Sequence, residues 1–276
     1  MTGVDLRDAL ILLPTSEGKS PDGDPSRSWG EIRSSVEFNS FNPLDRHRLA
    51  AIKRLWRATS EMGLRRREKL LECKGRRLEQ AVALNKTVLI SPTMPASERY
   101  TGVMFSALAY QALPSSAKKH FDENAIIVCG LFGLMRPTDL VPDYKVPIAA
   151  NIGRRVGSLT GFWRKHASPA VKALASGRVV LNLLPKAQGR IWAAGGSSDR
   201  EVTFRFVKIK DGKARSLAHA SKHLRGLLIR RILAEEVTST DDLQSLNLDG
   251  YSLDPGRTED DGRHISLTLV ASGDQS

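Results

Sequence analysis

The sequence has few cysteines and no long apolar run, and both shortages narrow the class of protein. Its 276 residues include only two cysteines, Cys73 and Cys129, whose separation does not match a metal-binding motif. With so few thiols and no signal-peptide pattern, we expect a cytoplasmic protein in a reducing compartment. No apolar run approaches the roughly 18 residues of a membrane span, so we expect no membrane partner.

Familiar catalytic signatures are also missing. Gly18-Lys19-Ser20 follows an apolar run, but the upstream glycine of a phosphate-binding P-loop is absent. No catalytic triad, paired-carboxylate or metal motif stands out. His219 and His223 lie four residues apart without a partner acid, which favours a surface pair over a zinc site. We therefore expect no metal and no cofactor, and we find no internal repeat.

Positive charge is what the chain has in excess. It carries 42 Lys and Arg against 30 Asp and Glu, a net charge of +12. Between Arg46 and Arg77, twelve Lys or Arg stand against three Glu, and Arg65-Arg66-Arg67 is the densest point. This balance favours a polyanionic partner, with a solvated helix surface as the alternative. Residues 235–276 are acidic, and we expect this segment to be partly flexible and to lie away from the basic surface.

Apolar periodicity predicts a mixed α/β (α+β) fold in a single domain over residues 1–276. Buried strands are expected at 10–13, 125–129 and 179–184. An alternating strand is expected at 202–209, followed by a hairpin turn at Asp211-Gly212 and a return strand at 214–219. Helices are expected in two or three pieces over the basic region 46–84, and at 99–110, 115–121, 162–175 and 216–233.

The run from Ser216 to Leu233 is the most chemically loaded segment. On a helix it has an apolar stripe and an opposite face that carries Lys222, Arg225 and Gly226. The two cations repel each other, and the glycine costs about 1 kcal/mol of helix stability relative to alanine. If Ser221 caps this helix, both cations lie in its first turn and the bare backbone of Gly226 admits a bulky anion. A solvated basic face with a helix-packing glycine is the alternative.

Several motifs, in this order and spacing, resemble the YaaA peroxide-stress family in the form seen in actinobacterial members. They are Leu12–Lys19, Tyr100–Gly102, Gly130–Asp139 with Tyr144, Phe162-Trp163, Lys222–Leu227 and Gly250-Tyr251. The resemblance implies a compact single body with a central mixed sheet, a basic cleft and a helix-hairpin-helix-like element. It also implies DNA binding and protection against hydrogen peroxide by limiting free iron and DNA damage.

The sequence departs from the family pattern in two places. After Asn182, where members usually carry a small polar residue and then an acidic-Tyr pair, residues 183–190 read LLPKAQGR. The region 46–77 is also more basic than expected, and both departures are compatible with a specialised paralogue. The turn from Gly130 to Gly133 matches a helix-hairpin-helix signature only in part, because its glycines are three apart.

The first functional hypothesis is sequence-independent DNA binding through a basic cleft. The phosphate contacts would come from Lys19, Arg136, Lys222, Arg225, Arg65, Arg66 and Arg67, with backbone approach at Gly18, Gly130, Gly133 and Gly226.

The second hypothesis is an enzyme acting on a nucleotide, nucleoside or related small anion. Its candidate catalytic residues are Ser16, Glu17, Tyr100, Asp139 and Lys222. The alternative for Asp139 is an internal pair with Arg136. A basic scaffold for RNA or ribosomes is the third hypothesis. A closed pocket of ~300–1,000 Å³ would favour the enzyme, and an open groove continuous with Arg65–Arg67 would favour DNA.

Overall fold

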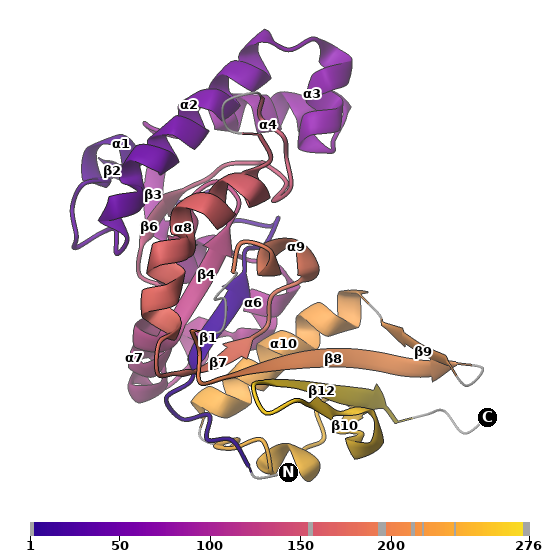
Figure 1. The fold of residues 1–276 in the computed structure, drawn as a ribbon. Helices are drawn as coiled ribbons and strands as arrows, with labels where there is room; N and C mark the ends of the chain where they lie inside the picture. The colour runs from indigo at the N-terminus through magenta and orange to yellow at the C-terminus, as the bar shows by residue number, and fades with distance from the viewer. Residues whose placement is uncertain are drawn as a thin grey trace.

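A mixed sheet of nine described strands runs through the middle of the protein (Figure 1). This computed structural model describes residues 3–153, 157–192, 197–210, 213–216, 218–234 and 236–272. The strand order is β10-β12-β8-β7-β1-β4-β5, with β9 paired to β8 and β11 to β12. The strands are β1 (Leu10–Pro14), β4 (Ala125–Cys129), β5 (Gly133–Met135), β7 (Val179–Asn182), β8 (Arg200–Lys210), β9 (Lys213–Ser216), β10 (Tyr251–Leu253), β11 (Glu259–Asp260) and β12 (His264–Ala271).

The five central strands, from β12 to β4, are parallel. Every residue of β1 and of β4 is buried, as expected for parallel strands covered on both faces. The predictions of strands at 10–13 and 125–129 are therefore confirmed. The third predicted strand ends at Asn182, because the Asn182 side chain accepts a hydrogen bond from the Leu184 amide (2.9 Å) and turns the chain.

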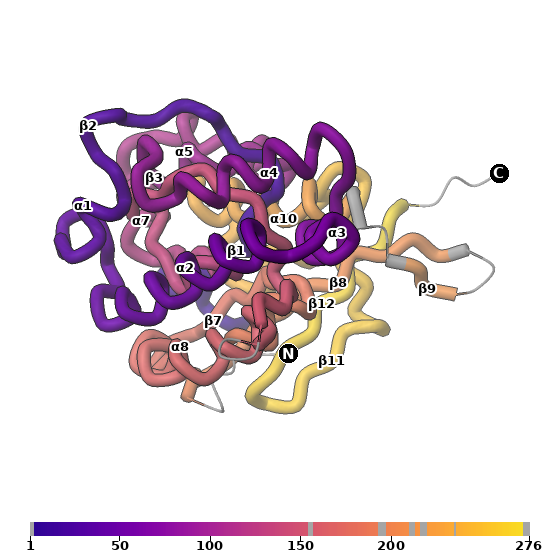
Figure 2. The backbone as a smooth tube through the Cα atoms, turned by 90° about the horizontal axis from the view of Figure 1, so that it is seen from above, coloured from indigo at the N-terminus to yellow at the C-terminus, as the bar shows by residue number. Residues whose placement is uncertain are grey.

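The basic region forms three helices, α2 (Asp45–Glu61), α3 (Leu64–Leu71) and α4 (Gly75–Thr87), so the prediction of two or three pieces is confirmed. Figures 1 and 2 show them as a layer at one end of the molecule, beyond the sheet. The other helices are α1 (Trp29–Ile32), α5 (Ala96–Arg99), α6 (Val103–Leu108), α7 (Ser115–Asn124), α8 (Leu159–Ala175), α9 (Lys186–Gly189) and α10 (Ala218–Leu233), with short 3-10 turns at Asn42–Leu44, Tyr110–Ala112, Asp242–Gln244 and Pro255–Arg257. None of the helices in the described ranges is long and apolar enough to cross a membrane.

A second, three-stranded antiparallel sheet lies beside the helical layer. It joins β2 (Asp24–Ser28), β3 (Pro92–Pro95) and β6 (Leu140–Pro142) in that order. On the side of the molecule away from this second sheet, β8 and β9 project as a hairpin, to the right in Figure 1. The predicted turn Asp211-Gly212 of this hairpin lies outside the described residues. The acidic segment supplies β10, β11 and β12 to the main sheet.

The turn from Gly130 to Gly133 is part of a β-hairpin, which corrects the expectation of a helix-hairpin-helix-like element there. It joins β4 to the antiparallel β5. The indole N–H of Trp163, on α8, donates to the Gly130 carbonyl (2.7 Å). A Cβ atom on Gly133 would lie 2.6 Å from the same indole ring. The glycine is therefore needed for packing against Trp163.

Two histidines stack where α2 meets α8. The ring centroids of His47 and His166 lie 3.9 Å apart, and Phe162 packs edge-on against both rings. Burial lowers the pKa of each imidazole below the ordinary 6.5. The charges of His166 and Arg46 further lower the pKa of His47. The charges of Lys165 and Arg46 further lower the pKa of His166.

We expect this pair to make stability fall on mild acidification. Because the folded pKa values lie below 6.5, the unfolded chain binds more protons just below that pH. The contribution of the two neutral imidazoles to the free energy of unfolding is fully present above pH 6.5. It is lost as the pH falls through their pKa values in the folded protein. Urea unfolding at about pH 7.5 and about pH 5.5 should show a smaller pH effect in His47→Gln than in the wild type. An unchanged pH effect would count against the stacked pair as its source.

Candidate functional site: a cationic pocket

A pocket of about 660 Å³ opens at the carboxyl ends of the parallel strands β1, β4 and β7. This edge of a parallel sheet is where ligands commonly bind. The chain places five segments around it. They are the loop Pro14–Lys19, the end of α3 at Leu71 and Glu72, the stretch Gly102–Phe105, the stretch Tyr144–Ala149, and Ser221, Lys222 and Arg225 of α10, with Gly130, Pro185 and Gln188 between them.

The loop after β1 is held rigidly against the start of α6. The Ser16 hydroxyl accepts a hydrogen bond from the Gly102 amide (3.2 Å) and donates to the Gly18 carbonyl (2.5 Å), which also accepts from the Thr101 amide (3.1 Å). A Cβ atom on Gly102 would lie 2.5 Å from the Cβ of Ser16, so only glycine allows this approach. The backbone of Lys19 forms a β-bridge with that of Tyr100. The side chain of Lys19 therefore extends from a fixed backbone position.

Lys19 lies against aromatic rings instead of a carboxylate. Its ammonium is 4.3 Å from the ring centroid of Tyr144 and 5.8 Å from that of Tyr100. The Lys19 ammonium donates a hydrogen bond to the backbone carbonyl of Glu17 (3.4 Å). Burial is the main cause that lowers the pKa of Lys19 to about 8. The charge of Lys145 acts in the same direction, and Asp143 opposes it.

The neighbouring lysine has the opposite environment. Lys145 Nζ lies 2.9 Å from the carboxylate of Glu17. The hydrogen bond from Lys145, followed by its charge, lowers the pKa of Glu17. Glu17 and Lys145 thus largely cancel each other, and the charges of Lys222 and Arg225 remain without a carboxylate partner in the described part of the chain.

Arg225 is the clearest uncompensated cation of the pocket. Its Nε is buried and has no hydrogen-bond partner among the described residues. Its guanidinium lies 6.0 Å from the Phe206 ring centroid, and burial lowers its pKa. A buried donor without a partner costs about 1–3 kcal/mol, more when the group is charged. An anion bound in the pocket would place a negative charge beside this guanidinium.

Two expectations about α10 need correction. The helix begins at Ala218, so Lys222 and Arg225 lie beyond its first turn and are not backed by a helix N-terminus. Gly226 faces α6 instead of the pocket, because a Cβ atom there would lie 2.2 Å from the Met104 carbonyl oxygen and 2.7 Å from the Ala107 Cβ. The helix-packing explanation of this glycine is the one that the structure supports.

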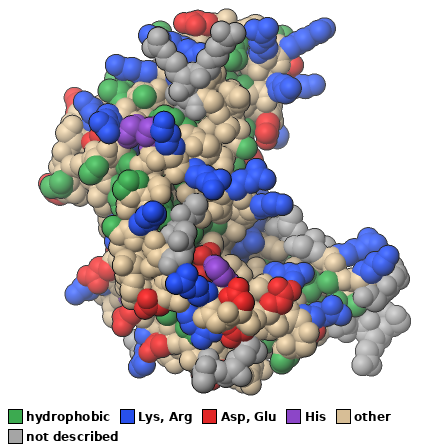
Figure 3. Space-filling model, in the orientation of Figure 1, with side chains coloured by type: hydrophobic (Ala, Val, Ile, Leu, Met, Phe, Trp, Pro, Cys, Tyr) green, Lys and Arg blue, Asp and Glu red, His purple; other side chains and the backbone are tan. Residues whose placement is uncertain are grey.

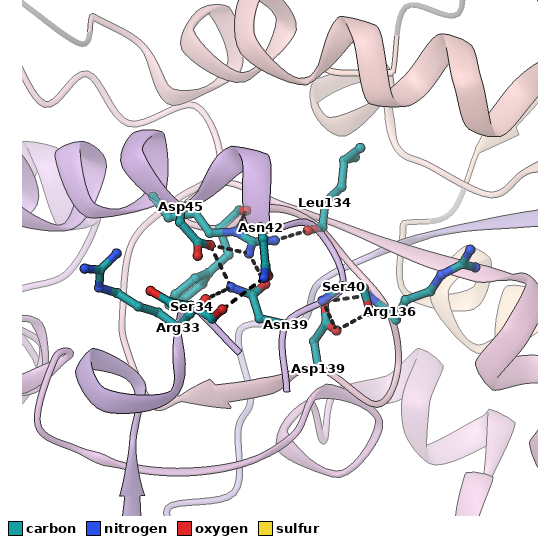
Figure 4. Close-up of polar contacts among 11 residues, drawn as sticks. Arg33, Ser34, Asn39, Ser40, Asn42, Asp45, Leu134, Arg136 and Asp139 are labelled. Carbon is teal, nitrogen blue, oxygen red and sulfur yellow. Dashed lines mark hydrogen bonds and ion pairs between the residues drawn. The ribbon is translucent and has the colours of Figure 1, made fainter. Parts of the chain in front are cut away.

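Arg136 and Asp139 lie outside the pocket and hold loops together (Figure 4). The Arg136 guanidinium donates to the carbonyls of Glu123 (2.7 Å) and Ala125 (3.3 Å). The carboxylate of Asp139 accepts from the amide and hydroxyl of Ser40 (2.9 and 2.6 Å) and from the Arg136 amide (3.0 Å). Burial raises the pKa of Asp139. The two side chains do not pair with each other.

Arg65, Arg66 and Arg67 also lie outside the pocket, on α3. The same helix reaches the pocket wall at its other end, through Leu71 and Glu72. Figure 3 shows Lys and Arg side chains gathered on the helical layer and around the recess between this layer and the lower sheet.

Tyr100 supports the pocket from behind. It is 2% exposed, and its hydroxyl lies 2.8 Å from the hydroxyl of Tyr144, which lies 3.0 Å from the Cys129 sulfur. Burial raises the pKa of both phenols well above the ordinary value. Both tyrosines therefore remain protonated, and Tyr144, which lines the pocket, is the one within reach of a ligand.

The polar lining residues that the sequence did not suggest include Lys145 and Gln188. Lys145 directly follows Tyr144, which lies in one of the matched motifs. Its position beside that motif could have suggested it as a site residue. Gln188 lies in the segment 183–190, where the acidic-Tyr pair is missing, and Pro185 of the same segment also lines the pocket. The departure from the pattern therefore falls on the pocket wall, where a neutral amide stands beside the cations.

His223, one of the two histidines singled out in the sequence, lies beside a single carboxylate. Nε2 of His223 lies 3.4 Å from a carboxylate oxygen of Asp249, and the His219 side chain lies outside the described residues. Within the described ranges, no group of three or more His, Cys, Asp or Glu side chains is arranged to hold a metal ion.

Comparison with known proteins matches most of the chain to one family. The family model described as peroxide stress protein YaaA covers residues 10–257. This chain belongs to the YaaA peroxide stress protein family. Among its relatives, a UPF0246 protein of Streptomyces coelicolor is 27% identical over 95% of this chain and 98% of its own length. A UPF0246 protein of Desulforapulum autotrophicum is 26% identical over 89% of this chain and 94% of its own length.

Proposed function

We propose that this YaaA-family protein is an enzyme that acts on a small anionic substrate, of nucleotide or nucleoside phosphate size, bound in the cationic pocket. The observation that carries the proposal is the meeting of Lys19, Lys222 and Arg225 around one cavity of about 660 Å³. This volume falls within the usual ~300–1,000 Å³ of small-molecule sites. Arg136 and the arginines Arg65–Arg67 of α3 are not among the residues that line it.

The lining divides into two parts that suit such a substrate. Lys222 and Arg225 are cations for a phosphate or carboxylate group. The apolar side chains of Val103, Phe105 and Ile148 offer a surface for an uncharged ring. Lys19, whose pKa is lowered to about 8, is suited to exchange a proton near neutral pH.

Replacing Arg225 with glutamine should weaken anion binding about tenfold or more, because a hydrogen bond to a charged group contributes about 1.5–3 kcal/mol. Isothermal titration with pyrophosphate and with a panel of nucleoside monophosphates would measure the change. Arg164→Gln, on the exposed surface of α8, is the matched control and should bind as the wild type does. Equal affinities in the two variants would contradict the proposal.

A second candidate, DNA binding in peroxide defence, is favoured by the surface of the helical layer. Trp56 of α2 is 45% exposed and is flanked by exposed Lys53 and Arg57. An exposed aromatic ring among cations suits stacking on bases and contact with phosphates. The Arg65–Arg67 cluster would extend this surface, and the family description supplies the link to peroxide stress.

If the helical layer binds DNA, replacing Arg65, Arg66 and Arg67 with glutamine should reduce the salt slope of log K by up to about 3, roughly one for each arginine that binds a phosphate. Fluorescence anisotropy with a labelled duplex over a salt series would measure this slope. Arg225→Gln should leave it unchanged, which separates the two surfaces. Absence of binding at low salt would remove this candidate.

A further inference from the structure

We propose that Lys19 is a nucleophilic amine that forms an imine with an aldehyde or ketone whose phosphate or carboxylate group is held by Arg225 and Lys222. The inference rests on the proposed function and deepens it. It narrows the substrate class from small anions to anions that carry a reactive carbonyl group.

The first argument is that two lysines lining the pocket have different surroundings. The ammonium of Lys145 is paired at 2.9 Å with the carboxylate of Glu17. Lys19 has no carboxylate within 4.0 Å among the described residues, and it rests on the face of the Tyr144 ring. Loss of hydration on burial, with no ion pair to offset it, favours the neutral form of an amine. Of the two, Lys19 is the lysine suited to attack.

The second argument is the fixed position of Lys19. Its loop is tied to the segment Tyr100–Gly102 by the hydrogen bonds of Ser16 and Gly18 described above. Burial lowers the pKa of its amine to about 8, so a larger fraction than in an ordinary lysine carries a free lone pair near neutral pH. The amine is therefore both held in place and partly unprotonated before a substrate enters.

The third argument is the unpartnered cation in the same cavity. Arg225 Nε is buried without a hydrogen-bond partner among the described residues, and Lys222 lies one turn before it on α10. These groups would fix the anionic end of a substrate. The amine that would receive the carbonyl carbon lines the same cavity of about 660 Å³.

The chemistry needs neither an oxidant nor a reductant. The Nζ lone pair forms a C–N bond while the π pair of the carbonyl moves to its oxygen. Nitrogen loses a proton and oxygen gains one, giving a carbinolamine. A further proton converts the hydroxyl to water, which leaves as the C=N bond forms. The balance is one amine, one carbonyl and one proton in, and one iminium ion and one water out. The proton of the Lys19 ammonium is lost to water before the attack, since the pKa of this amine is lowered to about 8.

Reductive trapping tests the proposal on the full chain. The protein is incubated with glyceraldehyde 3-phosphate, or with glyceraldehyde as the uncharged match, in the presence of sodium cyanoborohydride, and labelled lysines are mapped by mass spectrometry. We expect the phosphorylated aldehyde to label Lys19 at least about tenfold faster than glyceraldehyde does, and faster than any other lysine. Arg225→Gln should remove this preference. Lys165→Arg, on the exposed face of α8, should leave labelling of Lys19 unchanged.

Lys19→Arg and Lys19→Gln should both lose the main label while their circular dichroism spectra remain those of the folded protein. Labelling spread evenly over surface lysines would overturn the proposal, as would a main label that persists in these variants. If pyrophosphate binding still depends on Arg225 but Lys19 is not labelled, the imine is excluded and the proposed function stands. If pyrophosphate binding is also independent of Arg225, both fail.

Discussion

Replacing Arg48 with methionine should lower the free energy of unfolding by about 3–5 kcal/mol, the usual cost of removing one partner of a buried ion pair. Arg48 is 1% exposed, although it lies within the most basic stretch of the chain. Its guanidinium donates to the carbonyls of Phe132 (2.9 Å) and Leu134 (2.6 Å) and pairs with Asp45 (3.1 Å). Methionine would fill much of the volume but would leave two carbonyls and a buried carboxylate without this donor.

Urea denaturation followed by circular dichroism would measure this change in stability. Lys53→Met is the matched control, because Lys53 lies exposed on the same helix, α2. Its stability should change by less than about 0.5 kcal/mol, as for most surface substitutions. A similar destabilisation in both variants would mean that Arg48 stabilises only through α2 itself, and not through its hydrogen bonds to the carbonyls of Phe132 and Leu134.

Replacing Gly226 with alanine should destabilise the protein by about 1–3 kcal/mol, as overpacking does. Two effects oppose each other here. Alanine favours the helix by about 1 kcal/mol relative to glycine. The added Cβ, however, would lie 2.2 Å from the backbone oxygen of Met104, which cannot rotate away as a flexible side chain would. We expect the steric effect to win, because α10 must move away from α6 to relieve it.

Thermal unfolding of the Gly226→Ala variant would show whether its stability falls or rises. Gly189→Ala in α9 is the control, because no atom lies within 4 Å of a Cβ built at that position. It should be neutral or slightly stabilising. A stabilised Gly226→Ala variant would show that the helix pair has room that the structure does not indicate.

Most of the elements could be predicted from the sequence, because their patterns are local. The apolar runs of β1 and β4 predict strands that are covered on both faces. The apolar residues at helical spacing in α2, α3 and α4 predict helices with one face against the core. A cap at Ser221 would start α10 too late, because the helix already continues through that residue. The family resemblance, carried by motifs in order, is confirmed by the family match.

The site was predictable only in part, because pockets are made by contacts distant in sequence. Ser16, Glu17, Lys19, Lys222 and Arg225 do line one cavity. A charge count, however, cannot distinguish Arg48, which is buried and paired, from an exposed arginine. It also cannot show that the Arg136 guanidinium binds the backbone, or that Lys145 neutralises Glu17.

The placement of β12 has a consequence for how the chain is made. In the finished sheet β12 lies between β8 and β10, in parallel register with β8 from His264↔Glu201 onward. During synthesis β8 emerges well before β12, with all of α10 between them, so one edge of β8 stays unpaired for several seconds at ~5–20 residues per second. An open strand edge invites pairing with other chains. We therefore expect the nascent chain to depend on chaperones at this stage, and truncations before His264 to aggregate.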